Sequence, residues 1–184
     1  MIHRILLAIL LLAALPARAA DLAGVTLPDT RVVDGATLRL NGIAGRTYTV
    51  FRVTVYVVGL YLERPTRDAA AILRSPERKL IEVRYLRDVG ENDVRRAWRV
   101  LLDANCPTPC GVPAASIERF LLLSPGIRAG SSGTYVLTQT SVTVIADGRP
   151  IGTIPGADFA QLLLATFIGA EPTSASVRAA LLGG

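Results

Sequence analysis

The stretch that most constrains the fold is RTYTVFRVTVYVVGLYLE, residues 46–63. From Val50 to Leu62 it is rich in β-branched and aromatic residues, which suit the pleated surface of a strand. Toward its end the residues of both faces are apolar, so we expect a central strand covered on both sides. Arg46 and Arg52 interrupt this run. Each is either a solvated edge charge or a cation that faces a pocket and holds an anion.

The first residues have the layout of a secretory signal peptide. MIHRILLAILLLAALPARAAD has a short basic start, an apolar run over residues 5–15 and a small-residue site at residues 17–19. The apolar run is too short to serve comfortably as a permanent transmembrane anchor. We therefore expect a signal peptide over residues 1–19, cleaved after Ala19 or after Ala20.

Export limits what the remaining domain, residues 20–184, can do. We expect it to be periplasmic in a Gram-negative cell and secreted otherwise, with no permanent membrane anchor. His3 is the one histidine of the chain and leaves with the signal peptide. A domain without histidine cannot run a Ser-His-Asp or Cys-His mechanism, and it lacks the commonest zinc ligand. Since no glycine-rich phosphate loop is present either, we predict no metal site and no cofactor.

The charge of the chain does not predict a nucleic-acid partner. Loss of Arg4 and Arg18 with the signal peptide lowers the formal net charge from +5 to +3. The basic residues are scattered, and Lys79 is the only lysine among them. A clustered basic patch, which phosphate binding would need, is missing from the sequence.

Cys106 and Cys110 lie in NCPTPCG, close together in the chain. In an oxidising compartment such a pair predicts a structural disulfide. Redox chemistry is the alternative, although thioredoxin-like motifs use a spacer of two residues. A bridge that closes so short a loop removes little chain entropy, so we expect it to fix the loop locally.

The order of the remaining patterns predicts an α+β fold. Residues 36–45 alternate as a strand and then reach Gly42 and Gly45, which indicate a turn. Residues 78–86 predict another strand, and Asp147-Gly148 predicts a hairpin inside residues 133–154. Helical patterns cover residues 66–75, residues 91–105 with Asn92 as the N-cap, residues 113–123, the segment around Phe159–Phe167, and a last short helix capped by Thr173 or Ser174. Strands followed by helices, a hairpin and more helices are typical of an antiparallel sheet with helices on one face.

Three segments resemble the chalcone isomerase-like family: LNGIAGR, VYVVGLYLE and FAQLLLATFIGAEPTSASVRAALLG. The resemblance runs from about Val25 to Gly183 and is greatest to the bacterial exported branch. It implies an open-faced β-sandwich, in which a layer of helices covers one face of an antiparallel sheet. Plant members of the family close a phenolic ring with the help of an arginine. Related members bind fatty acids through an arginine and a tyrosine, with the acyl tail between sheet and helices.

This resemblance assigns three residues to a ligand site. Arg46, at the end of LNGIAGR, matches the family arginine. Tyr56 falls where isomerases carry a catalytic threonine, and VYVVGLY is similar to the VYAAGLY pattern of fatty-acid-binding members. Thr166, in ATFIG, matches a pocket threonine of the isomerases. The pocket tyrosine and asparagine of isomerases have no match in residues 86–99, which argues against isomerase chemistry.

The same three residues also have plain structural interpretations. Arg46 near a strand end fits a solvated charge, and Tyr56 in an apolar run fits a core aromatic residue. Thr166 on an apolar helix face fits a core threonine bonded to its own helix backbone. Arg46 and Tyr56 are ten residues apart, so they meet at one ligand only if the chain folds back near residues 47–49.

The sequence therefore leaves three functions open. The leading hypothesis is an exported domain that binds a small amphipathic acid, such as a fatty acid, through Arg46, Tyr56 and Thr166. The second is an isomerase, or intramolecular lyase, that acts on a phenolic or enone substrate with Arg46 and Thr166 as its catalytic residues. The third is a structural or partner-binding domain. The first hypothesis favours a protein that is not an enzyme.

Overall fold

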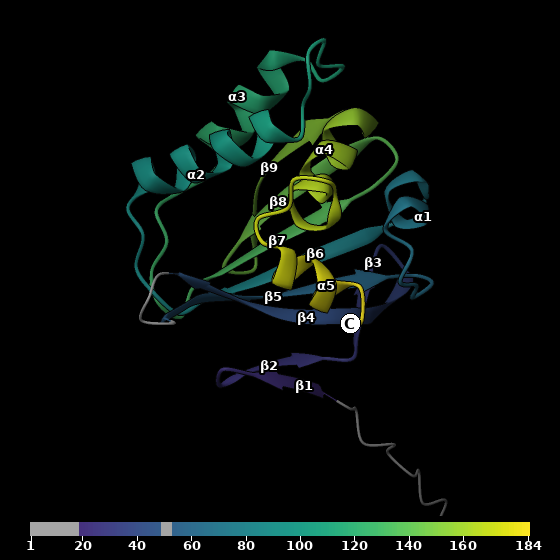
Figure 1. Cartoon of the computed structure of the whole chain (residues 1–184), viewed down its shortest axis with the longest axis vertical. Coiled ribbons are helices and arrows are strands. Elements are labelled where there is room, and N and C mark those ends of the chain that lie inside the picture. Colours follow the sequence, from purple (N-terminus) through teal and green to yellow (C-terminus); the bar gives the residue numbers. More distant parts are fainter. Residues whose placement is uncertain (1–18, 49–52) are drawn as a thin grey trace, which may run out of the picture.

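A curled antiparallel sheet forms the body of the computed structural model, which describes residues 19–48 and 53–184 (Figure 1). In this described part the sheet has seven strands in the order β3-β4-β5-β6-β7-β8-β9. The strands are β3 (Thr30–Val33), β4 (Ala36–Tyr48), β5 (Val53–Leu62), β6 (Lys79–Tyr85), β7 (Ser132–Leu137), β8 (Ser141–Ala146) and β9 (Arg149–Pro155). Each strand pairs antiparallel with the next one in the chain. The predicted α+β class with an antiparallel sheet is confirmed.

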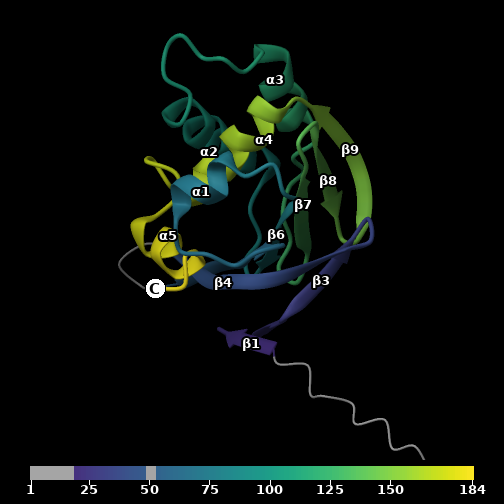
Figure 2. The ribbon, with the colours of Figure 1, turned by 90° about the vertical axis from the view of Figure 1, so that its right-hand side faces the viewer.

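Helices gather on one side of this sheet, inside its curl (Figure 2). They are α1 (Ala69–Arg74), α2 (Glu91–Ala104), α3 (Ala114–Leu122), α4 (Ala157–Ile168) and α5 (Ala175–Leu181). The core lies between these helices and the sheet, where α4 buries eight of its residues. This layered arrangement is the open-faced β-sandwich that the resemblance implied.

The start of α2 differs from its prediction. Asn92 was expected to cap the helix, but the helix begins at Glu91, and Gly90, two residues before Asn92, occupies the cap position without a side-chain bond. Glu91 and Asp93 lie in the first turn. Their negative charges stabilise the positive end of the helix, so a capping side chain is not required there. Ser174 does cap α5, as one of the two predicted residues, through its hydroxyl oxygen and the Val177 amide.

β5 lies between β4 and β6, as its apolar run predicted. Val57 and Val58 are neighbours whose side chains point to opposite faces of the sheet, and both are 0% exposed. Both faces of the strand are therefore covered, which explains why β5 lacks the polar–apolar alternation of a half-exposed strand. Arg52, the second arginine of the run, lies outside the described residues.

The turn predicted at Gly42 and Gly45 is wrong, because β4 continues through both glycines to Tyr48. A Cβ atom at Gly42 would collide with the backbone carbonyl oxygens of Ala180 and Leu181 at the end of α5. Gly42 therefore allows close contact between a helix end and the sheet, which is the other reason for a glycine inside a strand.

A separate hairpin, β1 (Ala19–Leu22) with β2 (Val25–Pro28), covers the outer face of the sheet near β5. Leu27 is 0% exposed, and a Cβ atom at Gly59 would come within 2.7 Å of its side chain. The Tyr61 hydroxyl donates a hydrogen bond of 3.0 Å to the carbonyl oxygen of Pro28. The hairpin thus seals the face of β5 that the helices do not reach.

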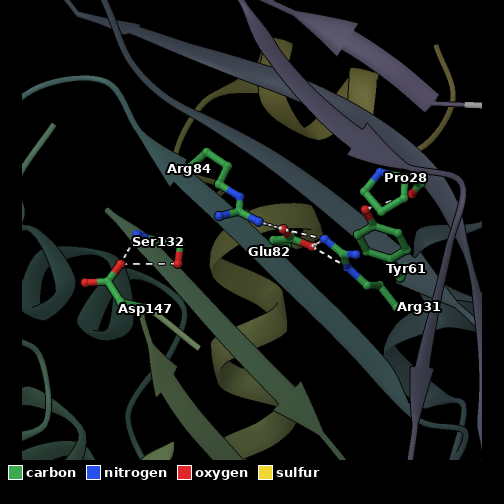
Figure 3. Close-up of polar contacts among 7 residues, drawn as sticks. All are labelled: Pro28, Arg31, Tyr61, Glu82, Arg84, Ser132 and Asp147. Carbon is green, nitrogen blue, oxygen red and sulfur yellow. Dashed lines mark hydrogen bonds and ion pairs between the residues drawn. The ribbon is translucent and has the colours of Figure 1, made fainter. Parts of the chain in front are cut away.

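A buried carboxylate connects the edge strand β3 to the centre of this outer face (Figure 3). Glu82 is 3% exposed, and its side chain accepts two hydrogen bonds of 2.8 Å from Arg31 and one of 2.7 Å from Arg84. The Arg31 guanidinium also lies 5.9 Å from the ring centre of Tyr61. Two charge-assisted hydrogen bonds from Arg31 thus connect β3 to β6 across the outer face.

The loop between α2 and α3 carries the expected bridge. Cys106 and Cys110 are joined in a disulfide, with their Cα atoms 5.1 Å apart. Asn105, at the end of α2, donates hydrogen bonds from its side chain to the carbonyl oxygens of Leu101 and Glu171. The bridge closes the loop locally, and the bond to Glu171 connects the end of α2 to the segment that follows α4.

The predicted signal peptide lies almost wholly outside the described residues and stays a prediction. Ala19 is described, and it pairs with Pro28 as the first residue of β1. Among the described residues, no helix is long and apolar enough to cross a membrane.

Glu82→Gln should lower the free energy of unfolding by about 1.5–3 kcal/mol, the range for hydrogen bonds to a charged group. It also leaves Arg31 and Arg84 without the anion between them. Glu118→Gln is the matched control, because Glu118 forms an exposed ion pair with Arg99 and should cost only about 0–1 kcal/mol. Urea unfolding of both variants measures the difference. Equal losses would show that the buried carboxylate does not hold the outer face.

Candidate functional site

Arg46 and Tyr56 are opposite each other across β4 and β5. The reversal of the chain that their meeting requires falls between Tyr48 and Val53, and residues 49–52 lie outside the described residues. Directly opposed residues of an antiparallel pair project from the same face, and Tyr56 packs against the core under the helices. Both side chains therefore belong to the helix side of the sheet.

Arg46 carries a charge that no carboxylate neutralises within the described part of the chain. Its Nη1 donates a hydrogen bond of 3.2 Å to the Thr47 carbonyl oxygen, and its guanidinium lies 5.7 Å from the ring centre of Tyr48. A cation–π contact and one carbonyl leave most of the five guanidinium donors available. The group can therefore accept an anion without first breaking an ion pair.

Tyr56 places a phenol beside this cation. Its hydroxyl is 3.2 Å from the Thr173 hydroxyl, and either atom can be the donor. Burial raises the pKa of Tyr56, while the Thr173 hydrogen bond and the positive charge of Arg46 act in the opposite direction. The phenol is therefore protonated at neutral pH. When Thr173 donates, the phenol hydrogen is available to a ligand.

Thr166 behaves as its structural interpretation predicted. It is 0% exposed, and its hydroxyl donates a hydrogen bond of 2.7 Å to the Leu163 carbonyl oxygen of its own helix. Its backbone carbonyl accepts a bond of 2.7 Å from the Thr173 amide. Thr166 thus connects to Tyr56 through Thr173, whose hydroxyl the sequence analysis considered only as a helix cap. A direct role of the Thr166 hydroxyl in ligand binding stays a prediction.

Two further tyrosines continue inward from Tyr56. The rings of Tyr56 and Tyr85 meet edge to face, with centres 6.4 Å apart, and the hydroxyls of Tyr85 and Tyr135 both lie near Gly133. Gly133 leaves room for them, since a Cβ atom there would lie 3.0 Å from the Tyr85 hydroxyl oxygen. Tyr85 comes one residue before the segment in which a pocket tyrosine was sought. Residues alternate between the two faces along this strand, so Tyr85 lies on the same face of the sheet as Ile81. This alternation could have identified Tyr85 from the sequence.

Aromatic rings from the helices surround the inner end of this tyrosine series. Trp98 of α2 lies 5.7 Å from Tyr135, 5.0 Å from Phe120 and 6.0 Å from Phe167, measured between ring centres. These edge-on contacts are the favoured geometry for packed rings. Trp98 is therefore part of the core, as predicted, and forms the apolar wall opposite the sheet.

The inner tyrosines are also neutral at ordinary pH. Burial raises the pKa of Tyr85 to about 12, and it raises the pKa of Tyr135 well above its ordinary value. Neutral hydroxyls in an apolar interior can donate hydrogen bonds to an uncharged or anionic oxygen. The candidate site thus has one cation, Arg46, and one phenol, Tyr56, at its outer end. Its interior is apolar except for the hydroxyl groups of the inner tyrosines.

A separate cavity of about 320 Å³ opens at the other end of β5. Leu62 lines it, six residues beyond Tyr56, which corresponds to roughly 20 Å along an extended strand. This cavity is distinct from the Arg46 site and none of the three predicted ligand residues lines it. Among the described residues, no cluster of histidine, cysteine or carboxylate side chains is arranged to hold a metal ion.

The curled antiparallel sheet with its layer of helices places the chain among proteins with a chalcone isomerase-like fold. The sequence model of the chalcone isomerase-like family matches residues 19–183, so the chain belongs to that family. Its fold is similar to that of a crystallised fatty-acid binding protein from Arabidopsis thaliana, with a TM-score of 0.74 and 15% identity, over 90% of this chain and 96% of that one. No curated protein sequence matches the chain significantly.

Stability should fall as the pH rises above the ordinary tyrosine pKa of about 10. Tyr85 ionises near 10 in the unfolded chain but only at about 12 in the folded one. The unfolded state therefore loses its proton first, and the stabilisation present below pH 10 is lost as the pH rises toward 12. Tyr85→Phe should reduce this pH slope, measured by urea unfolding at about pH 9 and about pH 11. An unchanged slope would contradict the assignment.

Proposed function

We propose that this domain binds a small amphipathic acid, of the fatty-acid type, between its sheet and its helices. The observation that carries the proposal is Arg46, which no carboxylate of the described residues neutralises, opposite the protonated Tyr56 at the border of an apolar aromatic interior. A carboxylate needs cationic and hydrogen-bond donors, while its tail needs apolar walls. Both are present on the helix side of the sheet. The fold shared with a fatty-acid binding protein supports the same function.

Charge and burial favour a carboxylate as the anionic group. A planar guanidinium forms two parallel hydrogen bonds to a carboxylate, and the Tyr56 phenol supplies a third donor nearby. Without a ligand, the Arg46 charge lies beside an apolar interior, which is unfavourable for a cation. A bound anion removes this cost, so the ligand and the arginine stabilise each other.

An isomerase acting on a phenolic or enone substrate is the second candidate. It is favoured by the neutral hydroxyls of Tyr85 and Tyr135 beyond Tyr56, which can bind the oxygen atoms of a ring substrate. In that reaction Arg46 stabilises developing negative charge on the substrate. Conversion of a phenolic enone, followed by its absorbance, tests this candidate. Binding of the enone without turnover favours the first function.

Arg46→Ala should weaken octanoate binding by about 1.5–3 kcal/mol, the value of a hydrogen bond to a charged group. Binding of octan-1-ol should barely change, because the alcohol carries no charge. Arg46→Lys should restore only part of the octanoate affinity, since an ammonium cannot reproduce the planar fork. Isothermal titration of the three proteins measures these values.

Thermal melts of the same proteins separate a ligand role from a structural one. The melting temperature of Arg46→Ala without ligand should equal or exceed that of the wild type, because an unpaired cation has been removed from an apolar border. Unfolding of this variant would show that Arg46 is structural. Unchanged octanoate affinity would exclude Arg46 as the carboxylate site.

Export belongs to the same proposal, with the domain in the exported branch of its family and periplasmic in a Gram-negative cell. Intact-mass analysis of protein from the exported fraction should give a chain that begins at Ala20 or Asp21. The same sample, alkylated under denaturing conditions without a reductant, should gain no label at Cys106 or Cys110. A full-length chain would contradict export, and two labelled cysteines would contradict the disulfide in the exported protein.

A further inference from the structure

The cavity at the far end of β5 is lined by residues of α1, of the start of β6 and of the segments beside them. Its apolar wall comes from β5, α1 and the segment that joins them, and its polar wall comes largely from the segment between α1 and β6. The apolar lining is Leu62, Pro65, Ala71 and Ile72, and the polar lining is Arg64, Thr66, Ser75, Glu77, Arg78 and Lys79. The volume of about 320 Å³ lies at the lower end of the range for small-molecule sites.

Lys79 is the buried cation of this cavity and the only lysine of the chain. Its residue is 6% exposed, and its Nζ donates hydrogen bonds of 2.6 Å to the Ser75 carbonyl oxygen and 2.8 Å to the Glu77 carbonyl oxygen. Within the described part of the chain these are the only acceptors bonded to Nζ. An ammonium has three N–H donors, so one donor of this cavity-lining lysine remains without an acceptor among the described residues.

Burial of an ammonium lowers its pKa, and that is the main effect on Lys79. The negative charges of Glu77 and Glu63 act in the opposite direction. Neither carboxylate has an ion pair with Lys79, because Glu77 pairs with Arg64, and Glu63 lies 3.8 Å from Arg78. The lysine therefore lacks a direct counterion among the described residues. A buried ammonium is costly without a paired anion, so binding of an anion here is favourable.

The charges of the lining select the sign of a ligand. Arg64, Arg78 and Lys79 contribute three positive charges, whereas Glu77 contributes one negative charge, and Glu63 beside Arg78 a second. The balance is positive even when both carboxylates are counted. An anionic group near Lys79, with a short apolar tail along Leu62 and Ile72, satisfies both walls.

We propose that this cavity is a second binding site, for a small amphipathic carboxylate whose anionic group contacts Lys79. It is separate from the Arg46 site and does not depend on the function proposed for that site. The size of the cavity restricts the ligand to a short acyl chain. The far end of β5 then carries its own acid-binding site, whatever the Arg46 site binds.

The single lysine allows a direct test. Protein labelled with ¹³C,¹⁵N-lysine gives one set of side-chain NMR signals, all from Lys79. Titration with hexanoate should shift the Lys79 Cε signal and reach saturation, whereas hexan-1-ol should give a much smaller shift. Lys79→Met should weaken hexanoate binding at this site by roughly ten- to a hundredfold, measured by isothermal titration in an Arg46→Ala background. Absence of a Lys79 shift while hexanoate saturates the protein elsewhere would overturn the proposal.

Two further variants keep the test decisive. Arg78→Gln removes a half-buried cation of the lining and should also weaken binding, even if Lys79→Met fails to fold because Nζ bridges two carbonyl groups. Arg74→Gln is the matched control, because Arg74 is an exposed cation of α1 outside the cavity, and it should leave the affinity unchanged. If Arg74→Gln and Arg78→Gln lower the hexanoate affinity equally, the binding reflects only general charge attraction, and the proposal is overturned.

The outcome also separates the two sites. In Arg46→Ala the hexanoate shift of Lys79 should persist, since the cavity does not include Arg46. Loss of the shift in Arg46→Ala would show that Lys79 only reports the Arg46 site, which overturns the second site and leaves the first function intact. A Lys79 shift that persists in Arg46→Ala, together with unchanged octanoate affinity, would support the second site and exclude Arg46 as the carboxylate site.

Discussion

Every layer of this domain depends on burying both faces of β5. A strand that is apolar on both sides is stable only when a second layer covers each face. The helices α4 and α5 cover one face, and the hairpin of β1 and β2 covers the other through Leu27. Polar groups are consequently excluded from the middle of β5 and appear near its ends. The position of both candidate sites follows from this exclusion.

At each end of β5 the structure places a cation beside apolar surface. Arg46 has a cation–π contact and a carbonyl, while Lys79 has two carbonyls, and neither has a carboxylate partner in the described residues. Glu82 on the outer face is the contrast, because two arginines neutralise it. The buried carboxylate is thus paired within the fold. An unpaired cation beside apolar surface is instead suited to a ligand that brings its own anion.

The elements could be predicted from the sequence because each carries a local pattern, such as the apolar run of β5. The contacts between distant segments could not. Gly42 indicated a turn, but the reason for the glycine is a helix that arrives from the other end of the chain. The sequence could not show that Arg46 pairs with Tyr56. It showed only that the chain must fold back between them if they are to meet. The hydroxyl of Thr173 at Tyr56 had no sequence signal, because it depends on the path of the loop after α4.

The close contact between α5 and Gly42 has a consequence for the order of folding. The inner face of β4, among the first segments to be synthesised, is completed by the last helix of the chain. Contacts between such distant segments make folding slow, because a long loop must close before they form. A growing chain therefore retains an uncovered strand until its C-terminus is available. Under the export proposed above, this delay would keep the chain unfolded for long enough to cross a membrane.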